Sequence, residues 1–362
     1  MEAVSGTQVR IKGRDFVSFA SNDYLGLSQH PEVIEEAALA LRAWGVGAKS
    51  ARLLQGYTVL HEALEKALAE FLHLPSALLF PSGYQANLAV LSTLAGRNGE
   101  IFSDRLNHAS MNDGARLSFA RFSRYPHLDL ETLEKLLQKS RAKEKIIATE
   151  SVFSMDGDTP PLPEMLALAH AHGAWLYIDD AHGLGVLAEG RGTLAHFGLK
   201  GENVILMATL GKALGAGGAF VAGPKPAIRR LEQEAKSQRF TTALAPALAA
   251  AALKSLAFIQ EKKAPLDVLK GHIAKMRAFL GIPWIGAIWP FMVGDEEETR
   301  SLSSWLLGKG FYVPAVFYPT VPQKKARLRI SLSGAHEEEH LLDLLGLLDE
   351  AKKMISHGTP LR

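Results

Sequence analysis

The sequence contains no cysteine among its 362 residues. This absence excludes disulfide bonds, thiolate nucleophiles and metal sites built on cysteine. Long hydrophobic runs are missing as well, because the longest uncharged stretches, Phe240 to Leu253 and Ala278 to Gly294, are shorter than about 18 residues and contain Pro or Gly. The N-terminus lacks the basic region and the apolar run of a signal peptide. We therefore expect no membrane partner and a cytoplasmic location.

The sequence also lacks an excess of either charge. Its 40 Lys and Arg residues against 38 Asp and Glu residues give a net charge of +2, without a long basic block. This balance predicts no nucleic-acid partner. A hydrophobic content of 47% is typical of a globular protein, and the length suits one large domain and a smaller one. The expected divisions are an N-terminal segment (1–30), a large domain (31–257) and a small C-terminal domain (258–362).

Strand-like and helical segments alternate through the large domain. Short apolar runs predict strands at 77–80, 101–103, 146–150, 174–178 and 204–209, with amphipathic helices between them. The run from Ala174 to Ile178 is apolar throughout, as is typical of a parallel strand buried on both faces. The large domain is therefore predicted to be α/β, with a mostly parallel central sheet flanked by helices. After Pro226 the pattern predicts helices and then a smaller α+β domain.

Lys212 follows the apolar run Val204 to Thr209 and is surrounded by small, glycine-rich residues. Desolvation at the end of a buried strand can hold a lysine amine neutral, and a neutral amine is a nucleophile suited to Schiff-base chemistry. A solvated loop lysine is the ordinary alternative. A phosphate-binding P-loop is excluded, because Leu206 and Ala213 occupy its Gly and Ser/Thr positions. A dinucleotide fingerprint is excluded too, because Phe220 replaces its third glycine.

Polar residues follow the other predicted strands. Gly83 and Tyr84 lie at a turn into a helix, where free backbone N–H groups suit a phosphate, although any βα unit offers this geometry. His108 follows the next strand, and Asp179 and His182 follow the run from Ala174 to Ile178. Carboxyl ends of parallel strands meet at one edge of a sheet, where ligands bind. His108, Asp179 and His182 could also hold a metal, but that reading leaves Lys212 unexplained.

Several motifs occur together in one order. Asp179-Asp180-Ala181-His182-Gly183 is followed, 33 residues after Asp179, by Lys212 in Thr209-Leu210-Gly211-Lys212. Upstream stand Ser21 to Leu27, Asn107-His108-Ala109-Ser110 and Phe153 to Gly157. With these motifs the sequence resembles, over nearly its whole length, the α-oxoamine synthases, which are pyridoxal-phosphate enzymes of the aspartate-aminotransferase fold. The resemblance implies pyridoxal 5'-phosphate as cofactor and the type I fold, with residues 31–257 binding the cofactor.

Further residues are similar to the biotin-pathway member of the family, namely Ser50 to Gly56, His61, Glu62 and Gly190 to Thr193. The resemblance implies decarboxylative condensation of L-alanine with pimeloyl-CoA or pimeloyl-acyl carrier protein. Glycine-using siblings, the 2-amino-3-ketobutyrate ligases and 5-aminolevulinate synthases, remain alternatives. So do an aminotransferase and, more remotely, a non-catalytic scaffold, although none of the catalytic motif positions is lost.

The family implies a role for each motif residue. Lys212 is expected to form the Schiff base and move protons, and Asp179 to keep the pyridine nitrogen protonated. His108 is expected to stack on the ring, while His182 and Ser154 bind its hydroxyl, and His182 is also expected to polarise the thioester carbonyl. The expected catalytic residues are Lys212, His108, His182 and Asp179.

The remaining expected contacts concern the phosphate and the substrate. Gly83, Tyr84 and Thr209 are expected to hold the phosphate, and Thr241 or Thr242 to reach the phosphate of a second subunit in a homodimer. Asn22 and Arg329 are expected to bind the amino-acid carboxylate, with Thr320 touching substrate. Family members carry an extra N-terminal helical segment with a substrate-binding basic residue, whereas about twenty residues precede Ser21 here. We therefore expect the acyl carboxylate to be recognised from elsewhere or more weakly.

Overall fold

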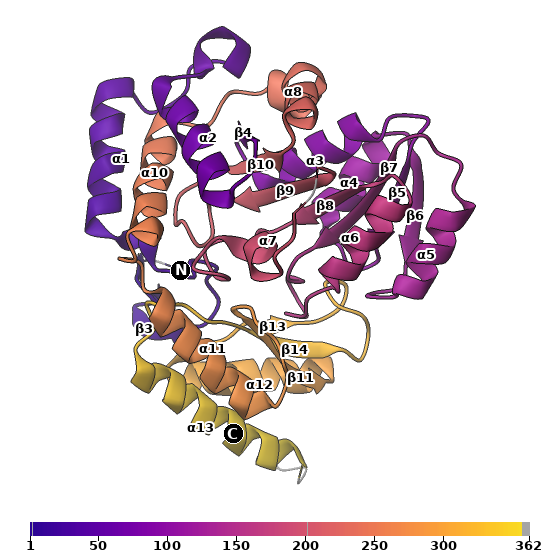
Figure 1. Cartoon of the computed structure of the whole chain (residues 1–362). Coiled ribbons are helices and arrows are strands. Elements are labelled where there is room, and N and C mark those ends of the chain that lie inside the picture. Colours follow the sequence, from indigo (N-terminus) through magenta and orange to yellow (C-terminus); the bar gives the residue numbers. More distant parts are fainter. Residues whose placement is uncertain (2, 201, 357–362) are drawn as a thin grey trace.

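The computed structural model describes residues 1, 3–200 and 202–356. Its largest sheet has seven strands in the order β4-β10-β9-β8-β7-β5-β6 (Figure 1). Their bounds are β4 (Ser76–Phe80), β5 (Glu100–Asp104), β6 (Arg121–Tyr125), β7 (Lys145–Glu150), β8 (Trp175–Asp179), β9 (Val204–Thr209) and β10 (Ala219–Gly223). The five strands from β9 to β6 in this order pair in parallel. The predicted α/β fold with a mostly parallel sheet is confirmed.

Strand β10 is the exception to the parallel pairing. It runs antiparallel to both neighbours, with Ala219 opposite Thr209 on one side and Phe80 on the other. The strand was not predicted, because its Gly- and Ala-rich sequence follows directly on the glycine-rich turn after Lys212. Antiparallel strands can be joined by such a short connection, whereas a parallel pair needs a long crossover.

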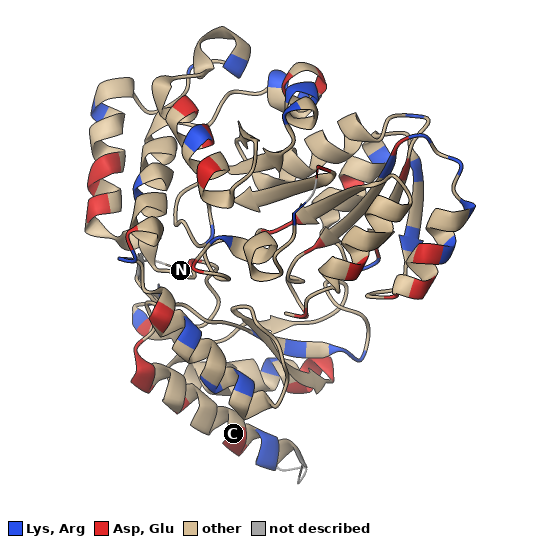
Figure 2. Ribbon diagram, in the orientation of Figure 1, with Lys and Arg blue, Asp and Glu red and all other residues tan. Residues whose placement is uncertain are grey.

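Helices cover both faces of this sheet. One face packs against α3 (Gly83–Leu94), α4 (Ala109–Leu117) and α8 (Lys225–Glu234). The other packs against α2 (Val59–Leu72), α5 (Leu130–Lys139), α6 (Leu162–Ala171) and α10 (Pro246–Gln260). Successive strand residues alternate between the two cores: Ile146 and Ala148 face α3 and α4, and Ile147 faces the opposite side. Figure 2 shows the charged residues mainly on helices and loops around the sheet, and few on its central strands.

A smaller layer lies below the large sheet in Figure 1. It contains the sheet β11-β14-β13, formed by β11 (Ile288–Gly294), β13 (Ala315–Val316) and β14 (Ala326–Ser331). Its helices are α11 (Leu266–Leu280), α12 (Glu296–Gly308) and α13 (Glu338–Ser356). This arrangement agrees with the α+β pattern expected after Pro226. Within the described part of the chain, no helix combines the length and apolar character needed to cross a membrane.

The N-terminal strands pair with the C-terminal part of the chain. β1 (Ala3–Ser5), β2 (Gln8–Ile11) and β3 (Arg14–Ser18) form a meander, and β3 pairs in parallel with β12 (Phe311–Tyr312). The chain then enters α1 (Pro31–Trp44), which packs against α10. The segment from Ala20 to His30 between β3 and α1 therefore passes between the two layers. The divisions near residues 30 and 257 remain predictions.

Candidate active site

The C-terminal ends of the parallel strands surround a cavity of about 220 Å³. The residues that line it come from the ends of β7, β8 and β9, from the turns after β8 and β9, and from the N-terminal parts of α3 and α4. They are Gly83, Tyr84, Asn87, His108, Ser110, Glu150, Asp179, Ala181, His182, Met207, Thr209 and Lys212. The residues predicted to bind the cofactor therefore line one pocket, with the exception of Ser154 and of Thr241 and Thr242, which were expected to act from a second subunit. This is the sheet edge at which α/β proteins bind ligands.

Lys212 reaches into this pocket from the turn after β9. Burial lowers the pKa of its amine, and the negative charges that Asp179 and an ionised Glu150 would carry only partly offset that effect. Its Nζ lies 2.9 Å from Nε2 of His182. A lysine whose pKa is lowered in this way spends more time as the neutral amine, which is the nucleophilic form.

Asp179 and His108 are held by one hydrogen-bond network. The side-chain amide of Asn87 donates to Asp179 Oδ2 at 2.9 Å and to Ser110 Oγ at 2.8 Å. Ser110 Oγ in turn lies 2.7 Å from His108 Nδ1, and the Tyr177 hydroxyl donates to Asn87 Oδ1. The backbone N–H of Ala181 donates to the other Asp179 oxygen at 3.1 Å. Asn87 was not predicted, because a polar residue inside an apolar helix gives no sign of its partner until α3 is placed over β8.

A second chain of hydrogen bonds leads from Lys212 toward the smaller layer. His182 Nδ1 lies 2.6 Å from the Tyr24 hydroxyl, which lies 3.2 Å from Asn22 Oδ1. Arg329, on β14, donates through Nη2 to the same Asn22 oxygen at 3.1 Å. These hydrogen bonds connect Lys212 and His182, which are predicted to bind the cofactor, with Asn22 and Arg329, which are predicted to bind the substrate carboxylate. Tyr24 is fully buried and was not singled out from the sequence, although it lies in the Ser21 to Leu27 motif.

Ser154 lies beside Arg329 and does not line the pocket. Its carbonyl accepts from Arg329 Nε at 2.7 Å, and its N–H donates to Glu150 Oε2 at 3.2 Å. Thr320 lies further away, exposed in the turn that follows β13, where its N–H donates to the Phe317 carbonyl at 3.0 Å. Thr241 accepts from the Gln85 side chain at 3.2 Å. The predicted substrate or phosphate roles of Thr320, Thr241 and Thr242 therefore remain predictions.

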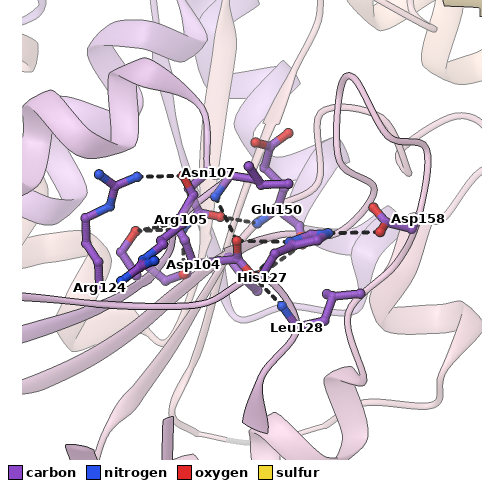
Figure 3. Close-up of polar contacts among 12 residues, drawn as sticks. Asp104, Arg105, Asn107, Arg124, His127, Leu128, Glu150 and Asp158 are labelled. Carbon is purple, nitrogen blue, oxygen red and sulfur yellow. Dashed lines mark hydrogen bonds and ion pairs between the residues drawn. The ribbon is translucent and has the colours of Figure 1, made fainter. Parts of the chain in front are cut away.

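The segment that carries Ser154 is fixed by His127 (Figure 3). Nδ1 of this histidine lies 3.0 Å from Asp104 Oδ1, and Nε2 lies 2.9 Å from Asp158 Oδ2. Burial lowers the pKa of His127, but the hydrogen bonds to Asp104 and Asp158 outweigh burial and raise the pKa to about 10. His127 is thus a cation that ties the 151–158 segment to the end of β5. Asn107 supports the same region by accepting from the Glu150 N–H at 3.2 Å.

Two buried oxygen atoms in the pocket have no partner. They are Thr209 Oγ1 and Glu150 Oε1. Buried polar atoms are normally hydrogen-bonded, so these two indicate a place for a polar ligand. Gly83 opens the space next to Thr209, because a Cβ at this position would lie 2.7 Å from the Thr209 methyl carbon. The N-terminus of α3 and the Thr209 hydroxyl thus form a cradle that fits a phosphate group.

Glu150 is a pocket residue that the sequence did not reveal. It ends β7 directly beside Asp179, which ends β8. Burial, together with the neighbouring Asp179 charge, raises the pKa of Glu150 to about 8. A neutral carboxylic acid can donate a hydrogen bond into the pocket, which a carboxylate cannot do. In the described ranges, no group of three or more His, Asp or Glu side chains is arranged to hold a metal ion.

Comparison with known proteins identifies the family. The model of the aminotransferase class I and II family matches residues 14–347. The 8-amino-7-oxononanoate synthase of Chromobacterium violaceum is 49% identical over 353 residues, which cover 96% of this chain and 92% of that protein. The chain belongs to the 8-amino-7-oxononanoate synthase family. The family resemblance expected from the strand-end motifs is therefore confirmed.

Solved structures of related enzymes show the same fold. A serine palmitoyltransferase structure that holds pyridoxal phosphate is 30% identical, with a TM-score of 0.94 over 98% of this chain and 92% of that one. The 8-amino-7-oxononanoate synthase of Francisella tularensis is 28% identical, with a TM-score of 0.81 over 93% and 98%. The predicted type I fold of pyridoxal-phosphate enzymes is thus confirmed, and members of the 8-amino-7-oxononanoate synthase family share it.

Proposed function

We propose that the chain catalyses the decarboxylative condensation of L-alanine with a pimeloyl thioester, carried by coenzyme A or by acyl carrier protein, to give 8-amino-7-oxononanoate. The observation that carries the proposal is the meeting of Lys212, Asp179, His182 and His108 in one pocket of a chain that is 49% identical to a synthase of that name. The enzyme is then a pyridoxal-phosphate-dependent acyltransferase of biotin biosynthesis.

Pyridoxal phosphate, when bound, supplies an electron-accepting ring that stabilises negative charge at the amino-acid α-carbon. Lys212 would hold it covalently, and Asp179 would pair with the ring nitrogen. The partnerless Thr209 hydroxyl and the N-terminus of α3, at Gly83 and Tyr84, would bind its phosphate. His108 would cover the ring face, and His182 with Ser154 would bind the ring hydroxyl.

The chain's own residues would then orient and deprotonate the substrate. Arg329 presents a planar guanidinium with several donors, which suits the alanine carboxylate, and Asn22 lies 3.1 Å from it. Lys212 would take and return the α-carbon proton, helped by its lowered pKa. Thr320, in an exposed turn, would contact the substrate.

The assembly and location are part of the proposal. A homodimer would bring Thr241 or Thr242 of a second copy to the phosphate, and the Gln85–Thr241 contact already joins that segment to α3. The cytoplasm is the compartment that would supply L-alanine and the thioester. Neither membrane nor nucleic acid is a partner.

Thiol release tests the proposed function. The purified protein, loaded with pyridoxal phosphate, is given L-alanine or glycine with acyl-CoA thioesters of increasing length. Release that requires L-alanine and is fastest with pimeloyl-CoA is expected. Release with glycine and a short acyl group would replace the proposal by a sibling synthase. If CoA thioesters give no release, pimeloyl-acyl carrier protein is tested. The absence of thiol release with both carriers contradicts the proposal.

A further inference from the structure

The hydrogen-bond chain from Lys212 to Arg329 contains one residue without an assigned role, Tyr24. Its ring is fully buried, and burial raises the pKa of its hydroxyl to about 12. The hydroxyl therefore keeps its proton throughout the range in which enzymes work. It has one proton to give and two possible acceptors, His182 Nδ1 at 2.6 Å and Asn22 Oδ1 at 3.2 Å, and the Arg329 guanidinium also faces its oxygen as a donor.

The contact between Arg329 and Asn22 decides where the Tyr24 proton goes. A guanidinium only donates, so Asn22 presents its oxygen to Arg329 Nη2, at 3.1 Å. If Tyr24 donated to His182, its oxygen and the Asn22 oxygen would face each other at 3.2 Å without a proton between them. If Tyr24 donates to Asn22, each donor in this series of hydrogen bonds faces an acceptor. The Tyr24 oxygen then accepts a proton from His182 Nδ1.

This direction fixes the tautomer of His182. Burial and the nearby cations Lys212 and Arg329 lower the pKa of its ring well below the usual value, so the imidazole is neutral. A neutral imidazole carries one proton. With that proton on Nδ1, the bare nitrogen is Nε2, which lies 2.9 Å from Lys212 Nζ. His182 and Lys212 line the pocket, and Tyr24 is not among the lining residues.

We propose that Tyr24 is a positioning residue that holds the proton of His182 on Nδ1 and so keeps Nε2 as a hydrogen-bond acceptor on the pocket side. The use of this arrangement rests on the proposed function. A bare Nε2 can accept a hydrogen bond from a ring hydroxyl of the cofactor or a proton from Lys212, whereas an Nε2–H can only donate. The assignment gives the Ser21 to Leu27 motif a physical task, which is to orient a histidine 158 residues away in sequence.

Nitrogen NMR of the full-length chain tests the tautomer directly. The protein is labelled with ¹⁵N in histidine, and spectra are recorded without and with pyridoxal phosphate. The His182 signals are assigned by their loss in His182→Gln. The expected pattern is a protonated Nδ1 and a bare Nε2. Tyr24→Phe, which removes only the hydroxyl oxygen, should shift proton occupancy toward Nε2. Tyr125→Phe removes a hydroxyl from another buried tyrosine outside the pocket lining and should leave the His182 signals unchanged.

Two results would overturn the assignment. One is a wild-type His182 that carries its proton on Nε2, and this measurement needs no variant to fold. The other is a protonated Nδ1 that persists unchanged in Tyr24→Phe, since some other group would then set the tautomer.

Kinetics give a second readout. In the thiol-release assay, kcat of Tyr24→Phe should fall about tenfold, because a misoriented catalytic group costs rate, while Tyr125→Phe keeps the wild-type value. A normal kcat in Tyr24→Phe counts against the role. The NMR result stands independently of substrate, so a wild-type protein that fails to condense alanine with pimeloyl thioesters overturns the proposed function and leaves the tautomer assignment to its own test.

Discussion

His182 and His127 both follow strands of the same sheet, and their surroundings give them opposite charge. His182 is 5% exposed, and beside Lys212 and Arg329 the pKa of its ring falls well below the usual value. His127, with 23% of its side chain exposed, lies between Asp104 and Asp158, which raise its pKa to about 10. Burial disfavours the charged form of both rings, so the neighbouring charges decide the outcome. We infer that the neutral ring serves chemistry and the charged ring serves structure.

The largest expected effect comes from removing the lysine beside His182. Lys212→Ala should lower thiol release by at least about 10⁴-fold, because no other pocket amine can hold the cofactor covalently and move the α-proton. Lys225→Ala, which changes an exposed lysine on α8, is the matched control and should be fully active. A Lys212→Ala protein with measurable turnover would remove the proposed role of this lysine.

His182→Asn should lower kcat about 100-fold and leave the apparent Tm nearly unchanged, because a neutral ring can be replaced by a neutral amide without leaving a buried charge unpaired. Steady-state thiol release and thermal unfolding of the same preparation check both parts. A large fall in Tm with normal kcat would mean that His182 serves structure and not chemistry.

His127→Asn should behave in the opposite way. Loss of the cation leaves the buried Asp104 and the mostly buried Asp158 to repel each other. We expect an apparent Tm lower by about 5 °C, with kcat within about tenfold of wild type, since breaking a buried ion pair mainly costs stability. His170→Asn, at an exposed histidine on α6, should change neither value. An unchanged Tm in His127→Asn would show that the contacts of His127 with Asp104 and Asp158 do not stabilise the fold.

The pH dependence of stability sharpens the same comparison. The pKa of His127 is raised from 6.5 to about 10, so its contribution is fully present below pH 6.5 and is lost as the pH rises through about 10. The Tm difference between wild type and His127→Asn should therefore shrink between these pH values. A difference that stays constant over this range would mean that His127 is neutral in the folded protein.

Glu150→Gln is expected to show its effect only in how Tm changes with pH. The pKa of Glu150 is raised from 4.5 to about 8, so wild type loses stability as the pH rises through this window, while glutamine does not titrate. The variant's Tm relative to wild type should rise from pH 4.5 to 8 and then level off, measured without cofactor. A flat difference would place the Glu150 pKa near its ordinary value.

The sequence predicts the scaffold well because hydrophobic periodicity is local. The strand β9 (Val204–Thr209) has the bounds that its apolar run predicts. The edge strand β6 and the helix α4 were not predicted, because their residues are mostly polar and no apolar stripe marks them. Their positions depend on pairing with β5 and packing on α3.

The site shows the same division between local and long-range information. Motif order was sufficient to predict that Lys212, Asp179, His182 and His108 lie together. Asn87, Glu150 and Tyr24 were not predicted, because each acts through a partner that is distant in sequence, such as the 92 residues between Asn87 and Asp179. Their roles require the three-dimensional arrangement of strand ends and the loop after β3.

The most direct test of the proposed reaction is the fate of the alanine carboxyl carbon. L-Alanine labelled with ¹³C at C1 is incubated with pimeloyl thioester and the cofactor-loaded protein, and labelled CO2 and released thiol are measured together. Decarboxylative condensation predicts one labelled CO2 for each thiol and an unlabelled amino-ketone product. Thiol release without labelled CO2 would contradict the account, because the carboxylate that Arg329 is proposed to hold would then remain in the product.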